Sequence, residues 1–343
     1  MSKVFIIAEA GVNHDGDEAR ALELVTVAAA CGADAVKFQT FAADKLVARG
    51  TAKAAYQEAA TGEGDQHSML RRLELSPTAF ARIAGACAAQ GVEFMSTPFD
   101  EEAADLLVGL GMRRIKVPSG ELTNLPFLRF LAAKGLPLIL STGMADMTEI
   151  VRAVEAVRDI WRARGLAMGP EALTVLHCTS NYPAAVGDVN LRAMGTIAEG
   201  AGTPVGYSDH TLGVAVSVAA VALGATVIEK HFTLDKGLPG PDHKASLDPG
   251  ELRMLVEQVR AVEACLGSAS KGPTPAELPI RALVRRSVTL ARDLPEGSAL
   301  RSEDLVLLRP GTGIEPDAIG RVVGRRLRRA LPAGSTLDWS DLG

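Results

Sequence analysis

The chain has 343 residues, 47% of them hydrophobic and 22% charged, which is enough for a large core and more than one domain. Its net charge of −5 argues against a nucleic-acid-binding protein, because such proteins present strongly basic surfaces. The longest apolar tract, residues 212–228, is short for a membrane span and contains glycines, so the sequence does not predict a membrane protein.

The N-terminus and the cysteines indicate a cytoplasmic protein. Residues 1–3 lead directly into a β-branched run, without the pattern of a secretory signal peptide. The four cysteines are far apart and form no Cys-x-x-Cys pair, which is typical of reduced core residues.

Strand-like runs alternate with helical segments over residues 1–267. Eight such pairs favour a (β/α)8 TIM barrel over an open, doubly wound sheet, and no Gly-x-Gly-x-x-Gly turn follows the first strand. The predicted strands cover residues 4–9, 35–39, 93–97, 114–119, 138–142, 174–178, 205–208 and 226–230. The predicted helices include residues 18–30, 78–90, 102–110, 125–133, 148–164, 213–223 and 249–266.

The composition changes after this barrel domain. Residues 268–282 are rich in Ser, Pro and Gly and predict a linker. Residues 283–343 predict a separate small β-rich domain, with strands at 287–291, 305–308 and 321–327.

Polar side chains stand at the carboxyl ends of the predicted barrel strands, where the active site of a TIM barrel lies. Lysines and serines suit a phosphate or a carboxylate, and acids, amides and a tyrosine suit a polyhydroxylated ligand. We therefore expect an anionic, phosphorylated co-substrate that meets a sugar. The candidates for the anion are Lys37, Lys116, Lys230, Ser119, Ser180 and Ser208, and those for the sugar are Glu9, Gln39, Glu121, Tyr182 and Asp242.

Two histidines hold matching positions in the stretch 205–246. His210 and His231 each end a predicted strand, and one βα unit separates them, so parallel neighbouring strands bring both imidazoles to the same edge of the sheet. With Asp209, Glu229 and Lys230 beside them, they suggest an open divalent-metal site. The alternative is that each is a hydrogen-bonded core histidine without a metal.

These residues lie in motifs through which the chain, over nearly its whole length, resembles the sialic acid synthase family, the phosphoenolpyruvate-dependent synthases of nonulosonic acids. The barrel motifs are AEAGVNHDG (8–16), VKFQT (36–40), STPFD (96–100), KVPSGE (116–121), LSTGM (140–144), LHCTSNYP (176–183), GYSDHT (206–211), IEKHFTLDK (228–236) and PGPDHKAS (239–246). RRSV (285–288) and LLRPGTGI (307–314) resemble the antifreeze-like domain of that family, also called the SAF domain.

The resemblance implies condensation of phosphoenolpyruvate with open-chain N-acetylmannosamine, which gives N-acetylneuraminate and phosphate. Synthases that make N,N'-diacetyllegionaminate from a 2,4-diacetamido-trideoxy-mannose share nearly all these motifs and are the alternative. The resemblance also implies a Mn²⁺ or Mg²⁺ ion held by His210 and His231. Asn181 and the long insert at 41–76 are expected to contribute to the choice of sugar.

Roles for single residues follow from the same resemblance. Glu121, Lys116 and Glu9 are the expected catalytic residues, and Glu121 is the candidate that handles the attacking water. The residues expected to bind phosphoenolpyruvate are Lys37, Thr97, Lys116, Ser119, Ser180 and Ser208. Those expected to bind the sugar are Glu9, Gln39, Tyr182, Asp242 and Arg309, the last supplied by the SAF domain of the partner in a domain-swapped homodimer.

Three other functions compete with this interpretation. A related synthase of the 3-deoxy-octulosonate type needs an additional basic cluster for a phosphorylated sugar. An aldolase forms a Schiff base, here on Lys116 or Lys230. In a non-enzymatic protein, the C-terminal domain binds ice or carbohydrate, but this leaves the polar strand ends without a purpose.

Overall fold

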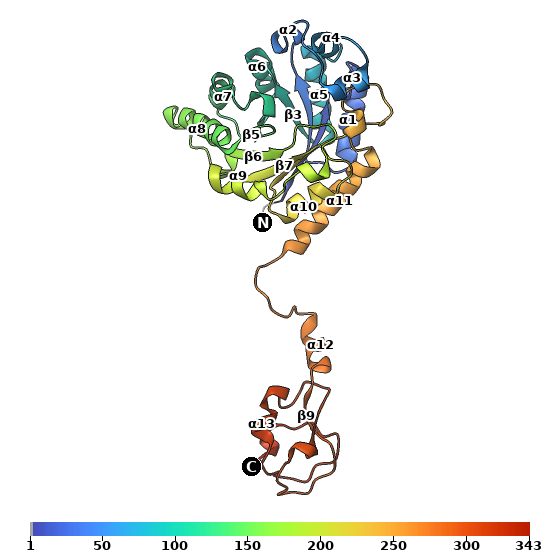
Figure 1. Ribbon diagram of the computed structural model, residues 1–343, viewed down its shortest axis with the longest axis vertical. Coiled ribbons are helices and arrows are strands. Elements are labelled where there is room, and N and C mark those ends of the chain that lie inside the picture. Colours follow the sequence, from blue (N-terminus) through green and yellow to red (C-terminus); the bar gives the residue numbers. More distant parts are fainter. Residues whose placement is uncertain (1–2) are drawn as a thin grey trace. The chain divides into compact units, whose positions relative to one another are not determined.

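The computed structural model describes residues 3–343 and divides the chain into two compact units. Unit 1 is Met1–Gly267 and unit 2 is Ser268–Gly343 (Figure 1). Among the described residues, no helix has both the length and the apolar character that crossing a membrane requires.

Unit 1 is a barrel of eight parallel strands, as the sequence predicts. The hydrogen-bonded order is β3-β2-β1-β8-β7-β6-β5-β4, and β3 packs against β4 at the two ends of this order, which closes the sheet. The strands are β1 (Phe5–Gly11), β2 (Ala35–Thr40), β3 (Glu93–Pro98), β4 (Ile115–Val117), β5 (Leu138–Ser141), β6 (Leu173–Cys178), β7 (Val205–Asp209) and β8 (Val227–His231).

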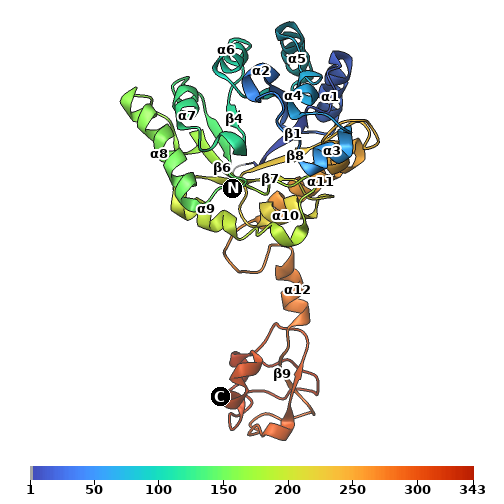
Figure 2. The ribbon, with the colours of Figure 1, turned by 45° about the horizontal axis from the view of Figure 1, so that its top comes forward.

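Helices form an outer layer around these strands (Figure 2). Aspartates begin several of them: Asp146 and Asp248 accept a hydrogen bond from the backbone N–H three residues on. The carboxylates of Glu149 and Glu251 in turn accept one from the backbone N–H of these aspartates, which completes a capping box. The helices of this layer are α1 (Glu18–Ala30), α5 (Pro77–Gln90), α6 (Glu101–Gly109), α7 (Leu125–Ala132), α8 (Met147–Ala163), α9 (Ala193–Ala201), α10 (Ala215–Ala222) and α11 (Pro249–Leu266).

The alternation of side chains along each strand separates two cores. Outward-facing residues such as Ile6 and Val36 pack with the helices, whereas inward-facing residues such as Ile7, Met95 and Val227 form a smaller cluster inside the barrel. Since successive residues point to opposite faces, polar residues at every second position toward the carboxyl ends also face inward. This pattern fixes which strand residues reach the barrel mouth.

Three short helices fill the insert between β2 and α5. They are α2 (Ala43–Leu46), α3 (Ala55–Thr61) and α4 (Gln66–Arg71). Asp65 begins α4, because its side chain accepts a hydrogen bond from Ser68 N at 2.9 Å.

Unit 2 has a small core of its own, which includes Val288, Leu290, Ile314, Val322 and Leu337. Its antiparallel strands β9 (Ser287–Leu290) and β10 (Leu305–Leu308) lie in two of the three predicted strand regions.

The third predicted strand, at 321–327, is wrong. Helix α13 (Ile319–Val322) occupies its first part, and Arg326 and Leu327 form only isolated bridges to Ala299 and Leu342. The β-branched pair Val322-Val323 favours a strand, but Val323 N donates to Ile319 O at 3.2 Å and Gly324 has a φ of +86°, so the chain turns there.

A helix lies partly within the range that the sequence predicts as a linker. Helix α12 (Glu277–Val284) overlaps the range 268–282. Just before it, Thr274 N donates to Glu277 Oε2 at 2.7 Å and Glu277 N donates to Thr274 Oγ1 at 3.3 Å.

Candidate active site

A cavity of about 550 Å³ opens at the carboxyl ends of the barrel strands. Apart from Asp209 and Lys230, the barrel residues that the sequence predicts for the site contribute to its lining. These residues are Glu9, Lys37, Gln39, Thr97, Lys116, Ser119, Glu121, Ser180, Tyr182, Ser208, His210, His231 and Asp242.

Two lysines and two glutamates form a buried cluster at the bottom of the cavity. Lys37 Nζ lies 2.6 Å from Glu9 Oε2 and 3.7 Å from Glu229 Oε2, and Lys116 Nζ lies 3.5 Å from Glu229 Oε1. All four side chains are almost fully buried. Sequence reasoning grouped Glu229 with the metal, and the structure places it between the two lysines instead.

Burial and ion pairing shift the pKa values of these groups in different directions. Burial raises the pKa of Glu9 to about 7 against the opposing charge of Lys37. Burial also acts to raise the pKa of Glu229, but Lys116 and Lys37 outweigh it and hold that pKa below its ordinary value. The pKa of Lys116 is lowered by burial. The two lysines that an incoming anion would meet are thus paired with two carboxylates. Of these, Glu9 has a higher pKa than Glu229.

Hydroxyl groups surround this cluster. Lys37 Nζ donates to Thr97 Oγ1 at 3.1 Å, and Ser208 Oγ donates to Glu229 Oε1 at 3.1 Å. On the opposite wall, Gly143 N donates to Ser119 Oγ at 2.9 Å. A Cβ at Gly143 would lie 2.1 Å from Ser180 Oγ, so only glycine leaves room for these two serines to converge.

The two histidines also meet in the cavity, with ring centroids 5.7 Å apart. His210 Nδ1 donates to Thr179 O at 2.7 Å, which leaves Nε2 as an acceptor, the usual arrangement of a metal-binding imidazole. His231 Nδ1 is buried and has no hydrogen-bond partner among the described residues. Burial also lowers the pKa of His231 well below its ordinary value, which keeps the ring neutral.

These two imidazoles fit a divalent ion whose remaining positions are open to water or substrate. No group of three or more His, Cys, Asp or Glu side chains in residues 3–343 is arranged to hold a metal ion. A buried imidazole nitrogen without a partner is the observation that favours a ligand here, because such groups are otherwise hydrogen-bonded.

Tyr182 lies between the two histidines and Tyr56, a residue that the sequence does not connect with the site. Its ring centroid is 4.1 Å from that of His210 and 5.6 Å from that of His231. On its other side it stacks on Tyr56 of α3, at 5.2 Å and an interplanar angle of 28°. The insert between β2 and α5 therefore forms part of the cavity wall. Nothing in the local pattern around Tyr56 indicates this contact.

Two of the predicted acids, Asp242 and Glu121, differ in burial. Asp242 is buried, and burial raises its pKa to about 6. Glu121 lies in a short 3-10 turn, Ser119–Glu121, at the end of β4, where its Oε2 accepts a hydrogen bond from Asn124 Nδ2 at 2.7 Å. Gln39 Nε2 donates to Glu9 Oε1 at 3.4 Å and so belongs to the deeper group.

Three residues named with the site lie elsewhere. Asp209 and Lys230 do not line the cavity, because the alternation along β7 and β8 turns them toward the helices, where they pair with each other at 2.8 Å. Lys230 is therefore wrong as a ligand for the anion. Arg309 is an exposed residue of unit 2.

A TIM barrel with paired lysines, hydroxyl groups and two imidazoles at its mouth defines an enzyme that binds an anionic substrate at a candidate metal site. The model of the NeuB family matches residues 24–271, and that of the SAF domain matches residues 285–343. The chain belongs to the NeuB family, the sialic acid synthase family, and is a phosphoenolpyruvate-dependent sugar acid synthase.

Relatives and a solved structure agree with this membership. The chain is 54% identical to the N,N'-diacetyllegionaminic acid synthase of Legionella pneumophila, over 98% of this chain and 94% of the relative. It is 44% identical to the enzyme of the same name from Campylobacter jejuni, over 92% of each chain. The crystal structure of N-acetylneuraminic acid (sialic acid) synthetase from Leptospira borgpetersenii superposes with a TM-score of 0.70 at 32% identity, over 81% of this chain and 90% of that one.

Proposed function

We propose that the protein condenses phosphoenolpyruvate with a 2,4-diacetamido-trideoxy-mannose to give N,N'-diacetyllegionaminate and phosphate. The observation that carries the proposal is the 54% identity over almost the whole chain to a relative named for this product. The solved sialic acid synthetase is only 32% identical. Synthesis of N,N'-diacetyllegionaminate, the alternative that the motifs leave open, is thus better supported than synthesis of N-acetylneuraminate.

The buried cluster suits phosphoenolpyruvate. Lys37 and Lys116 supply two positive charges in a region from which water is largely excluded, where charge-assisted hydrogen bonds to a phosphate or carboxylate are strong. Ser119 and Ser180 converge at Gly143 and offer hydroxyl donors on the opposite side. Thr97 and Ser208 complete the group of expected ligands.

His210 and His231 would hold the divalent ion, Mn²⁺ or Mg²⁺. When bound, such an ion supplies Lewis-acid polarisation of the acceptor aldehyde. In the reaction that we propose, C3 of phosphoenolpyruvate attacks the aldehyde carbon, water adds at C2, and phosphate leaves. Glu121, at the end of β4, is the residue that we assign to the attacking water, because its carboxylate faces the same cavity as Lys116.

The acceptor sugar is assigned to the part of the cavity beside the two histidines. Asp242, Gln39 and Glu9 offer acceptors for hydroxyl and amide hydrogens, and Tyr182 offers an apolar face beside the histidines. Tyr56 joins this wall from the insert, which supports the expectation that the insert takes part in the choice of sugar.

A homodimer is also part of the proposal. We assign Arg309 to the sugar site of a partner subunit in a domain-swapped homodimer, in line with the family resemblance. The four cysteines are all free, three of them buried, and a cytoplasmic location stays a prediction.

Phosphate release from phosphoenolpyruvate tests the reaction. The purified protein is assayed with the 2,4-diacetamido sugar and with N-acetylmannosamine, each with Mn²⁺ and with a chelator. A kcat/KM at least about tenfold higher for the diacetamido sugar is expected, because a site that pairs with an amide loses that energy when the amide is missing. Preference for N-acetylmannosamine would restore the sialic acid reaction, and inactivated enzyme after borohydride treatment with pyruvate would indicate a Schiff-base aldolase.

A further inference from the structure

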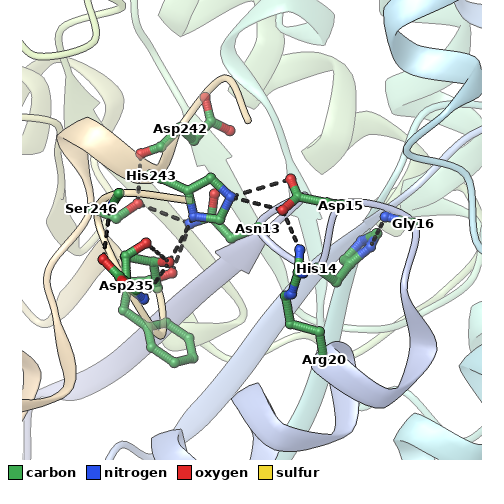
Figure 3. Close-up of polar contacts among 12 residues, drawn as sticks. Asn13, His14, Asp15, Gly16, Arg20, Asp235, Asp242, His243 and Ser246 are labelled. Atoms are coloured by element: carbon green, nitrogen blue, oxygen red, sulfur yellow. Dashed lines mark hydrogen bonds and ion pairs between the residues drawn. The ribbon is translucent and has the colours of Figure 1, made fainter. Parts of the chain in front are cut away.

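A buried histidine outside the cavity connects two loops of the barrel mouth. His243 has no exposed surface, and its Nε2 lies 3.1 and 3.2 Å from the two carboxylate oxygens of Asp15 (Figure 3). Because a carboxylate only accepts, Nε2 donates this hydrogen bond. The other nitrogen, Nδ1, lies 2.7 Å from Thr233 Oγ1. The two contacts fix the plane of the ring from both sides.

The two loops are built to approach each other closely. Asp15 has a φ of +51°, a left-handed conformation that is rare for a residue with a side chain, and it aims the carboxylate across the gap. Gly240, in the loop after β8, passes so near that a Cβ there would lie 2.5 Å from Asp15 Oδ1 and 2.7 Å from His243 Cδ2. Arg20 contacts the same carboxylate from α1.

A second set of contacts runs parallel to this pair. Asn13 Nδ2 donates to Ser246 Oγ at 2.9 Å and to Phe232 O at 2.8 Å. Ser246 Oγ in turn donates to the backbone oxygen of Asp242 at 2.7 Å. The loop that carries Asp242 is thus held at both ends by residues of the loop between β1 and α1.

Asp242 itself faces the other way. Its carboxylate points away from the His243 ring in Figure 3 and belongs to the lining of the cavity. The backbone between the two residues is short and constrained, since His243 begins a 3-10 turn, His243–Ala245, directly after Asp242. The contacts that fix His243 and Ser246 therefore lie directly beside the backbone of Asp242.

We propose that Asp15 and His243 act as positioning residues, which hold the loop between β8 and α11 so that Asp242 stands at the acceptor end of the cavity. The link to the acceptor rests on the proposed function. The link between the two loops does not, because it follows from the contacts alone. Neither residue touches the phosphoenolpyruvate cluster formed by Lys37 and Lys116.

Amide hydrogen exchange tests the loop without any substrate. Asp15→Ala and His243→Leu should each raise exchange in residues 242–247, where Ser246 N and Leu247 N donate to backbone oxygens in the folded loop. His243→Gln should stay near wild type, because the amide nitrogen of glutamine reaches the place of Nε2. Val259→Ala in α11, a buried site away from the loop, is the control for general destabilisation. Unchanged exchange in the two disruptive variants would overturn the proposal.

Steady-state kinetics test the consequence for Asp242. Asp15→Ala and His243→Leu should raise KM for the acceptor sugar by about tenfold while KM for phosphoenolpyruvate changes less than about twofold. The effects of the two single variants should not add in the double variant, since both break the contact between Asp15 and His243. Additive effects, or equal changes in both KM values, would contradict the positioning role. If wild type turns over neither sugar, the proposed function is wrong, and the exchange measurement alone decides the contact between the loops.

Discussion

Lys230 Nζ lies 2.8 Å from Asp209 Oδ2, and both side chains are about 1% exposed or less. Each residue directly precedes one of the two candidate ligand histidines. Asp209 also accepts hydrogen bonds from Thr211 and Ser217, and Lys230 donates to Thr211 O at 2.7 Å. The pair therefore ties the carboxyl ends of β7 and β8 together behind the candidate metal site.

Lys230→Met should destabilise the barrel by about 3 kcal/mol, because it leaves the Asp209 carboxylate buried without its cation. Urea unfolding followed by circular dichroism measures this loss. The double variant Lys230→Met, Asp209→Asn should regain part of the stability, since no unpaired charge remains. A single variant as stable as wild type would show that the pair does not hold the two strands.

The histidine pair is tested by metal binding as well as by activity. His210→Ala and His231→Ala should each weaken Mn²⁺ binding by more than about a hundredfold, because loss of a ligand costs more than loss of its outer partner. Electron paramagnetic resonance of free Mn²⁺ measures the affinity. His177→Ala is the matched control, since His177 contacts Val189 O and does not line the cavity. Unchanged Mn²⁺ affinity in both variants would mean that the histidines are core residues.

Glu121→Gln should lower kcat by about a hundredfold or more and leave KM for phosphoenolpyruvate nearly unchanged. The reason is that the amide keeps the hydrogen bond with Asn124 but no longer accepts a proton from water. Glu102→Gln, on the exposed surface of α6, is the control. A loss confined to phosphoenolpyruvate binding would instead give Glu121 a binding role.

His14 provides a prediction for the pH dependence of stability. The ring is buried, and burial lowers its pKa to about 4 from an ordinary value of 6.5. Between these pH values the unfolded chain takes up a proton that the folded chain does not, so the free energy of unfolding falls as the pH falls from 6.5 to 4. The pKa shift of His14 contributes about 3 kcal/mol to the free energy of unfolding, and this contribution is fully present above pH 6.5.

Urea unfolding at pH 7.5 and pH 5 measures the effect. His14→Asn should reduce the difference between the two pH values, because Oδ1 replaces Nδ1 as the acceptor for Gly16 N and does not titrate in this range. An undiminished pH dependence in this variant would assign it to other groups.

Arg309 is tested by mixing two inactive variants. If it completes the sugar site of a partner subunit, Arg309→Ala and His231→Ala should complement each other. Random pairing makes half the dimers mixed, and each mixed dimer has one intact site of two, so activity should recover to about a quarter of wild type. No recovery despite demonstrated subunit exchange would place Arg309 outside a site shared between subunits.

Most of the cavity was predictable because it follows from local periodicity. Each β-branched run indicates a strand, and alternation puts polar residues at its end on the same face as the inner core. Glu9, Lys37 and Lys116 obey this rule and meet in the structure. The same alternation turns Asp209 and Lys230 outward. The prediction for these two residues did not use it, because the pattern does not show at which residue a strand ends.

The sequence by itself therefore determined the barrel, the position of its active face and most of the side chains on that face, since these depend on repeats of two and of 3.6 residues. Only the tertiary structure decided which distant loops meet. Tyr56 reaches Tyr182 across an insert without strand periodicity, and Asp15 reaches His243 across 228 residues. Such contacts depend on how the loops and the short helices of the insert pack against the barrel, and no local pattern encodes that packing.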